Sequence, residues 1–154
     1  MPWPVELFEA LPSRRAAATV LDASVPVDWP DAELQELLDL YEPRLRSDPT
    51  LVGFGPWVVI REREVVGSAG FLGPPNESGE VELGYGIREE HRNRGFATEA
   101  ARALLAWALA QPGVERVVAR SEPANRPSTR VLEKSGLLGA GGGRWVSPAR
   151  GDGA

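Results

Sequence analysis

The order of elements in the second half of the chain constrains the fold more than any other feature of the sequence. Residues 80–87 have the composition of a strand, residues 97–110 repeat apolar side chains at helical spacing, and residues 114–120 are rich in valine. A strand, a crossover helix and a parallel strand of these lengths form a right-handed βαβ unit. The turn before the helix then lies at the carboxyl edge of the sheet, where α/β proteins bind ligands. Residues 128–134 predict a further helix and complete a β-α-β-α order.

The first half of the chain predicts a strand, two helices and a β-hairpin, in that order. These elements are expected over residues 4–11, 13–21, 31–48, and 56–61 with 65–71. Asp31 is suited to cap its helix, because an Asp side chain accepts a hydrogen bond from a backbone N–H of the first turn. A chain of 154 residues has the usual size of one compact domain. We therefore expect residues 1–154 to form a single domain.

Composition excludes several classes of active site. The chain has no cysteine and one histidine, His91, so disulfides, thiolate nucleophiles and Cys/His metal sites are excluded, and we expect no metal. His91 stands in the polar run of residues 89–94, which favours a solvated surface position. A formal net charge of −5 disfavours an extended nucleic-acid interface. We see neither a long apolar segment nor a secretory signal, and expect a cytosolic protein with no membrane association.

The turn between the strand at 80–87 and the following helix holds the chemically most informative residues. Gly95 lets the backbone approach a ligand, and the first turn of the helix offers unpaired N–H groups and a partial positive charge. Arg92 and Arg94 add positive charge, and the Thr98 hydroxyl is placed to reach an oxygen at the helix start. These features predict a phosphate group as the ligand. A plain turn with a helix cap is the other interpretation of the same residues.

Other phosphate-binding loops fit this sequence poorly. No G-x-x-x-x-G-K-[ST] motif is present, and Gly84 with Gly86 lacks the third glycine of G-x-G-x-x-G and lies inside the predicted strand. Nucleotide hydrolysis and Rossmann-type hydride transfer are therefore disfavoured. The two glycines suit a β-bulge or the close approach of a ligand, and packing against a bulky neighbour is the other reason for their presence.

Two motifs resemble one family of enzymes. Arg92-x-x-Gly95-x-Ala97 matches the Arg/Gln-x-x-Gly-x-Gly/Ala signature of the GNAT N-acetyltransferases, and a predicted strand precedes it at the right distance. Residues 82–100 resemble the fourth strand, pyrophosphate loop and third helix of that family. Residues 123–137 resemble the RimJ/RimL pattern Asn-x-x-Ser followed by Leu-Glu-Lys-x-Gly-Phe, although a leucine stands at the final position. The motifs cover about residues 80 to 137, in the family's order and spacing.

The resemblance implies an α/β fold of the GNAT type, with a mixed, mostly antiparallel sheet, a splayed central parallel strand pair and flanking helices. It implies acetyl-CoA as the cofactor, with backbone amides of residues 94–98 around the pyrophosphate and main chain of residues 85–87 along the pantetheine. Asn125 and Ser128 match positions whose side chains hydrogen-bond the cofactor in the RimJ/RimL branch, and helix capping is the other role open to them. The cofactor-binding residues implied in this way are Tyr85, Gly86, Ile87, Arg92, Arg94, Gly95, Phe96, Ala97, Thr98, Asn125 and Ser128.

The implied reaction is direct acetyl transfer to a primary amine, a small molecule or a peptide N-terminus, in a ternary complex. It requires a neutral nucleophile, a polarised carbonyl and a proton for the departing thiolate. Glu82 is the first candidate for the general base, ahead of Glu80 and Glu122. Many GNAT enzymes protonate the thiolate with a tyrosine at the position held here by Leu132, so Ser128 is the candidate proton donor.

Two other functions and one structural question stay open. The chain could be an acyl-CoA-binding sensor that has lost turnover, because the helix tyrosine is absent. A nucleic-acid-binding domain is the third interpretation, which the acidic charge disfavours. Residues 138–154 are low in apolar side chains and predict a loose segment with at most one short strand, at residues 144–146, where the family has a β-hairpin. A partner subunit in a homodimer would then supply the far wall of the acceptor site.

Overall fold

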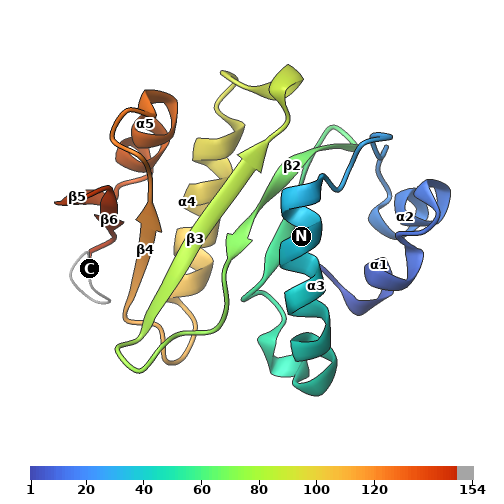
Figure 1. The fold of residues 1–154 in the computed structure, drawn as a ribbon, viewed down its shortest axis with the longest axis horizontal. Helices are drawn as coiled ribbons and strands as arrows, with labels where there is room; N and C mark the ends of the chain where they lie inside the picture. The colour runs from blue at the N-terminus through green and yellow to red at the C-terminus, as the bar shows by residue number, and fades with distance from the viewer. Residues whose placement is uncertain (149–154) are drawn as a thin grey trace.

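A mixed β-sheet forms the centre of the molecule (Figure 1), and the computed structural model describes residues 1–148. Within these residues the sheet has six strands in the order β1-β2-β3-β4-β6-β5. The strands are β1 (Pro56–Arg61), β2 (Glu64–Phe71), β3 (Glu80–Ile87), β4 (Arg116–Arg120), β5 (Leu138–Gly141) and β6 (Arg144–Val146). The helices are α1 (Val5–Ala10), α2 (Arg14–Leu21), α3 (Ala32–Ser47), α4 (Phe96–Leu109) and α5 (Arg126–Lys134), with single 3-10 turns η1 (Pro49–Leu51) and η2 (Glu89–His91). The predicted mixed α/β fold is confirmed.

The central strands β3 and β4 are parallel and separate after a short run of pairing. Their register runs from Glu80 opposite Arg116 to Leu83 opposite Ala119. Beyond Leu83, β3 continues to Ile87 in register with β2 alone. The other strand pairs of the described sheet are antiparallel. The predicted splayed parallel pair is therefore present, and its opening lies at the carboxyl ends of β3 and β4.

Helices cover both faces of the sheet (Figure 1), and the buried side chains form two clusters. α4 buries Ala101, Leu104 and Ala108, which recur at helical spacing, against β3, β4 and α5. On the opposite face, α1, α2 and α3 pack around Trp3 and over Val58 of β1. In Figure 1 the opening of β3 and β4 and the first turns of α4 and α5 lie at one end of the sheet, the upper end in this view.

The predicted strand at residues 4–11 is wrong, because most of this segment forms helix α1. Residues 1–3, just before this segment, make the strand-like contacts with β1 instead. The Met1 and Val58 backbones exchange hydrogen bonds, and Trp3 N–H donates to Pro56 O. Helix α1 follows this pairing, and its fully buried Leu7 belongs to the same core cluster as Trp3. The helices predicted over residues 13–21 and 31–48 are confirmed, with Ser13 and Asp31 as their N-caps.

The prediction of a loose C-terminal segment with at most one short strand is also wrong for residues 138–146. These residues form the antiparallel hairpin β5–β6, and β6 pairs with β4 through Val146 opposite Val118 and Arg144 opposite Arg120. The three glycines at 141–143 all have positive φ, between 61° and 88°, which is the backbone that a tight turn requires. The part of this prediction that concerns residues 149–154 lies outside the described residues.

No helix in the part of the chain that the structure describes combines the length and the apolar character needed to cross a bilayer.

Candidate active site

The opening between β3 and β4 exposes backbone groups of β3. Leu72 N–H donates to Glu82 O at 3.0 Å and Arg88 N–H donates to Val66 O at 2.8 Å, so the even-numbered residues of β3 bond toward β2. Because backbone groups alternate in direction along a strand, Tyr85 and Ile87 direct theirs toward the opening. Arg92 Nε donates to Ile87 O at 3.0 Å. The register therefore leaves the Tyr85 backbone as the group to which an extended amide chain could pair.

Gly84 and Gly86 keep one face of β3 open at this point. A Cβ atom added to either glycine would meet no other atom within 4 Å, so neither packs against a bulky neighbour. The register of β2 and β3 runs through both residues without a shift, so they form no bulge. The remaining interpretation, close approach of a ligand to the backbone, is the one that this geometry permits.

The turn before α4 has the geometry of an anion site. Gly95 is the N-cap, with φ +80°, and no side chain caps the first turn. A Cβ at Gly95 would meet nothing within 4 Å, so the space in front of the first-turn amides is open. Those amides have no partner inside the helix, and the helix dipole adds partial positive charge. Phe96, Ala97 and Thr98 are half-buried in this turn, whereas Arg92 and Arg94 are exposed.

His91 is buried, which contradicts its predicted position as a solvated surface residue. Its exposed fraction is 8%. Arg94 Nη1 lies 3.3 Å from Nδ1 and Glu64 Oε1 lies 3.3 Å from Nε2. Because a guanidinium can only donate, Nδ1 accepts and the Nε2–H donates to Glu64. The Arg94 guanidinium also lies 5.2 Å from the centroid of the Phe96 ring. His91 and Phe96 thus hold the Arg94 side chain beside the loop.

In the Asn-x-x-Ser segment, Asn125 caps helix α5 and Ser128 contacts β3. Asn125 is the N-cap of α5, since its Oδ1 accepts from Ser128 N–H at 3.3 Å. The Ser128 hydroxyl does not cap the helix. Its Oγ lies 2.8 Å from the Tyr85 phenol oxygen, and the phenol also lies within donating distance, 3.0 Å, of Ser128 O. Burial raises the pKa of Tyr85, and the hydrogen bond with Ser128 opposes this effect. Leu132 is fully buried in the core.

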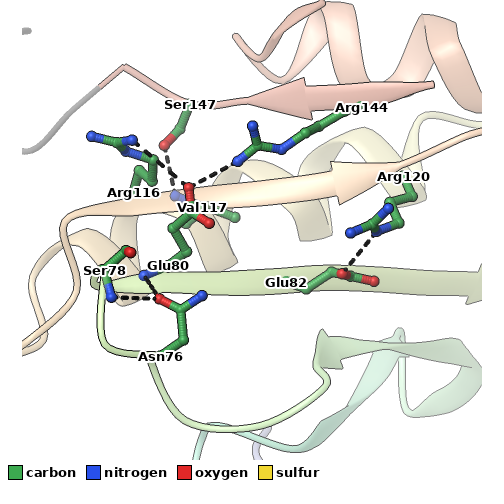
Figure 2. A network of polar contacts seen from close by, with 9 residues as sticks. All are labelled: Asn76, Ser78, Glu80, Glu82, Arg116, Val117, Arg120, Arg144 and Ser147. Carbon is green, nitrogen blue, oxygen red and sulfur yellow. Dashed lines mark hydrogen bonds and ion pairs between the residues drawn. The ribbon is translucent and has the colours of Figure 1, made fainter. Parts of the chain in front are cut away.

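The candidate bases Glu80 and Glu82 lie on the face of β3 away from α4, because Val81 and Leu83 pack into the core on the α4 side. Figure 2 shows both carboxylates in ion pairs. Glu80 lies 2.8 Å from Arg144 and 3.7 Å from Arg116, and its side chain is 19% exposed.

Glu82 is the candidate base closer to the opening of the strands. Its Oε1 lies 3.2 Å from Arg120 Nε, and it is opposite Val118, one position before the last parallel pair. The Glu82 side chain is 30% exposed and that of Arg120 is 74% exposed. Glu122, the third candidate, is exposed and follows the end of β4.

A cavity of about 310 Å³ lies between β1 and α4, lined mainly by apolar side chains that include Trp57, Val59 and Leu104, and it reaches Phe96 and Glu99 in the first turn of α4. It does not contain the residues of the β3–β4 opening or of the Asn-x-x-Ser segment. We therefore place the candidate site at the opening, where the titratable side chains and free backbone groups meet.

Comparison with known proteins agrees with this arrangement. The uncharacterized N-acetyltransferase YjdG of Bacillus subtilis is 35% identical over 113 residues, which cover 72% of this chain and 67% of YjdG. The chain spans about half the length of other curated relatives that it matches.

Two solved structures show the same fold. Aminoglycoside acetyltransferase AAC(6')-Ib in complex with coenzyme A and kanamycin has a TM-score of 0.60, 18% identity and coverage of 79% of this chain and 80% of that one. Spermidine N-acetyltransferase from Vibrio cholerae in complex with CoA and spermine has a TM-score of 0.59 and 15% identity, with 75% of each chain covered.

The domain family described as "Acetyltransferase (GNAT) domain" matches residues 5–138, which include every element from α1 to the start of β5. The chain therefore belongs to the GNAT family of acetyltransferases, enzymes whose cofactor is acetyl-CoA.

Proposed function

We propose that this protein transfers the acetyl group of acetyl-CoA directly to a primary amine in a ternary complex. The observation that carries the proposal is the opening between β3 and β4, which ends beside the uncapped first turn of α4. An amide chain linked to a pyrophosphate fits both features, since the chain can pair with strand backbone and the anion with helix amides. Acetyl-CoA supplies an activated thioester to this opening.

The residues that we propose to hold the cofactor follow from these two features. Main chain at Tyr85 would pair with the pantetheine, with Gly86 leaving the adjacent face of the strand open and Ile87 directing its N–H toward the same opening. The turn residues 92–98, with the Arg92 and Arg94 guanidinium groups, would hold the pyrophosphate. Asn125 and Ser128, at the start of α5, complete the set. The full set is Tyr85, Gly86, Ile87, Arg92, Arg94, Gly95, Phe96, Ala97, Thr98, Asn125 and Ser128.

The candidate base and the candidate proton donor lie on opposite faces of the opening. Glu82 projects from the face of β3 away from α4, whereas the Tyr85 side chain, which contacts Ser128, lies on the α4 and α5 face. We infer that the amine approaches from the Glu82 face. Glu82 accepts a proton from the amine as nitrogen bonds to the acetyl carbon. Ser128 donates a proton to sulfur as the carbon–sulfur bond breaks with its electron pair on sulfur, and solvent restores the hydroxyl.

We propose a small amine or a peptide N-terminus as the acceptor, in a RimJ/RimL-like branch of the family. Asn125-x-x-Ser128 and the Leu-Glu-Lys-x-Gly run that ends at Gly136 support the branch. Spermine and kanamycin in the two structural neighbours support a small cationic amine. An acidic chain, with formal net charge −5, attracts such cations.

Release of free thiol on mixing the protein with acetyl-CoA and a panel of amines tests the proposal. Mass spectrometry of peptides and small amines incubated with labelled acetyl-CoA identifies the acceptor. An acyl-CoA-binding sensor would bind the cofactor and release no thiol above background. That result would overturn enzymatic transfer and leave the cofactor site in place.

The β5–β6 hairpin changes the argument for a homodimer. The prediction depended on a C-terminal segment too short to complete the sheet, and the hairpin completes it. A second subunit is therefore not required to complete the sheet, and sedimentation of the purified protein tests the oligomeric state. We also propose that residues 1–154 form one acetyltransferase domain that acts in the cytosol.

Replacing Ser128 by Ala is expected to lower turnover on the order of tenfold to a hundredfold, because the departing sulfur loses its proton donor. The effect is smaller than for an alkoxide leaving group, since a thiolate is the better leaving group. KM for the amine should change little. The measurement is steady-state thiol release, with the melting temperature recorded in parallel.

Ser13→Ala is the matched control. Ser13 Oγ accepts from Ala16 N–H at 3.2 Å and caps α2, far from the opening. Loss of this cap should cost about 0.5 to 2 kcal/mol of stability and leave turnover of the folded protein unchanged. If Ser128→Ala behaves like Ser13→Ala, water and not Ser128 protonates the sulfur.

A further inference from the structure

The Tyr85 side chain is the polar group closest to Ser128 at the opening. Tyr85 is one of two tyrosines in the chain and lies two residues after the last parallel pair of β3 and β4. Its ring packs at the edge of the core between the sheet, α4 and α5. Its phenol oxygen lies 2.8 Å from Ser128 Oγ and 3.0 Å from Ser128 O. The contact joins β3 to the first turn of α5 across the opening.

The hydrogens of this pair can be arranged in two ways. If the Ser128 hydroxyl donates to the phenol oxygen, its hydrogen is occupied and the phenol donates to Ser128 O. If the phenol donates to Ser128 Oγ, the hydrogen of the serine hydroxyl is free to point at a third group. Only the second arrangement leaves Ser128 able to donate to a ligand in the opening.

The phenol donates in both arrangements, to Ser128 O in the first and to Ser128 Oγ in the second. Burial raises the pKa of Tyr85, so the phenol keeps its hydrogen at neutral pH. At position 132 in α5 a fully buried leucine stands in the core, so this position brings no hydroxyl to the opening. Ser128 and Tyr85 are therefore the hydroxyl groups that α5 and β3 bring together here.

We propose that Tyr85 is a positioning residue, whose phenol donates to Ser128 Oγ and turns the serine hydrogen toward the sulfur of acetyl-CoA. This inference rests on the proposed function, because it takes the β3–β4 opening as the cofactor site. The effect is transmitted through Ser128 alone. Removing the phenol oxygen should therefore weaken the hydrogen bond to sulfur without removing the serine hydroxyl.

Titration of free CoA bound to the protein tests the inference without turnover. A hydrogen bond to a thiolate stabilises the charged form and lowers the pKa of the thiol. The ultraviolet absorbance of the thiolate reports this pKa in the complex. Relative to wild type, we expect Ser128→Ala to raise the thiol pKa by roughly one unit, and Tyr85→Phe to raise it by a smaller amount.

The double variant separates a positioning role from a structural one. If Tyr85 acts through Ser128, Tyr85→Phe added to Ser128→Ala should change neither the thiol pKa nor kcat any further. In the wild-type background, Tyr85→Phe should lower kcat severalfold and leave KM unchanged. Tyr41→Phe is the matched control, since the Tyr41 phenol donates to Leu51 O at 3.1 Å in the other core cluster. It should lower the melting temperature and leave both the thiol pKa and kcat at wild-type values.

The outcomes distinguish this inference from the proposed function. A wild-type thiol pKa in Tyr85→Phe, or an equal shift with and without the Ser128 hydroxyl, overturns the inference. A thiol pKa that is lowered in wild type and raised in Tyr85→Phe, with no acetylation of any amine, supports the positioning role and overturns transfer. Failure of CoA to bind the wild-type protein overturns both.

Discussion

Replacing Gly95 by Val is expected to abolish the rise in melting temperature that acetyl-CoA gives the wild-type protein. A ligand that binds only the folded state stabilises it by mass action, by about 2.7 kcal/mol at a hundred times its Kd. The Gly95 backbone leaves open space in front of the first turn of α4. A valine side chain would fill that space and separate the pyrophosphate from the helix amides.

Strain and blocked binding must be separated in this experiment. Gly95 has φ +80°, a conformation that a β-branched residue adopts only at a cost, so Gly95→Val lowers stability without any ligand. Gly113→Val is the matched control, because Gly113 has φ +84° and lies beyond the other end of α4. A Cβ there would make an ordinary contact with Pro75 at 3.8 Å.

The control should melt at a lower temperature than wild type and still respond to acetyl-CoA. Calorimetric titration of both folded variants with acetyl-CoA gives the affinity directly. Wild-type affinity in Gly95→Val would show that the turn is a plain helix cap and that the anion site lies elsewhere.

Local patterns predicted most of the second half of the fold. The strand predicted over residues 80–87 has the same bounds as β3, because alternation of buried and exposed side chains is a local property. Helix α4 begins and ends one residue earlier than predicted, within the usual variation of helix boundaries. The strand predicted at 114–120 starts two residues later, at Arg116. Of the two errors in the fold, the one at residues 4–11 lies next to the pairing of residues 1–3 with β1, and the one at residues 138–146 contains the pairing of β6 with β4; local sequence shows neither pairing.

The contacts that shape the candidate site are too far apart in sequence to be predicted from it. Tyr85 and Ser128 are separated by 43 positions, and Glu82 and Arg120 by 38. His91 shows the consequence most clearly. Its polar neighbours in sequence predict exposure, but the imidazole is buried and has a partner in Glu64, an exposed residue 27 positions away. A motif can thus name the residues of a site without showing which of them contact each other.

Replacing Glu82 by Gln is expected to lower kcat roughly 10²-fold or more at neutral pH, because the amide keeps the shape of the side chain but cannot accept a proton. The ammonium form of the substrate then has no carboxylate acceptor at the opening, because Glu80, on the same face of β3, is paired with Arg116 and Arg144. Affinity for acetyl-CoA should hardly change, since Glu82 lies on the face away from α4 and α5. Stopped-flow thiol release across a range of pH measures the loss, and the acidic limb of the pH–rate profile should disappear.

The ion pair of Glu82 provides the first control. Glu82→Gln also separates the carboxylate from Arg120, whose side chain is 74% exposed and stays hydrated when unpaired. Arg120→Gln breaks the same pair and keeps the carboxylate. If the salt bridge alone matters, both variants should lose the same activity; if Glu82 is the base, Arg120→Gln should retain turnover.

Glu80→Gln is the second control, because it makes the same change two residues earlier on the same face of β3. Glu80 is held by Arg116 and Arg144 at the end of the strand away from the opening, so its loss should reduce stability more than turnover. If the pH–rate profile is unaltered in Glu82→Gln and flattened in Glu80→Gln or Glu122→Gln, the general base is the residue whose replacement flattens the profile. Unaltered profiles in all three variants would indicate that water accepts the proton of the amine. The face of β3 at Gly84 and Gly86 is open, so water can reach the amine there.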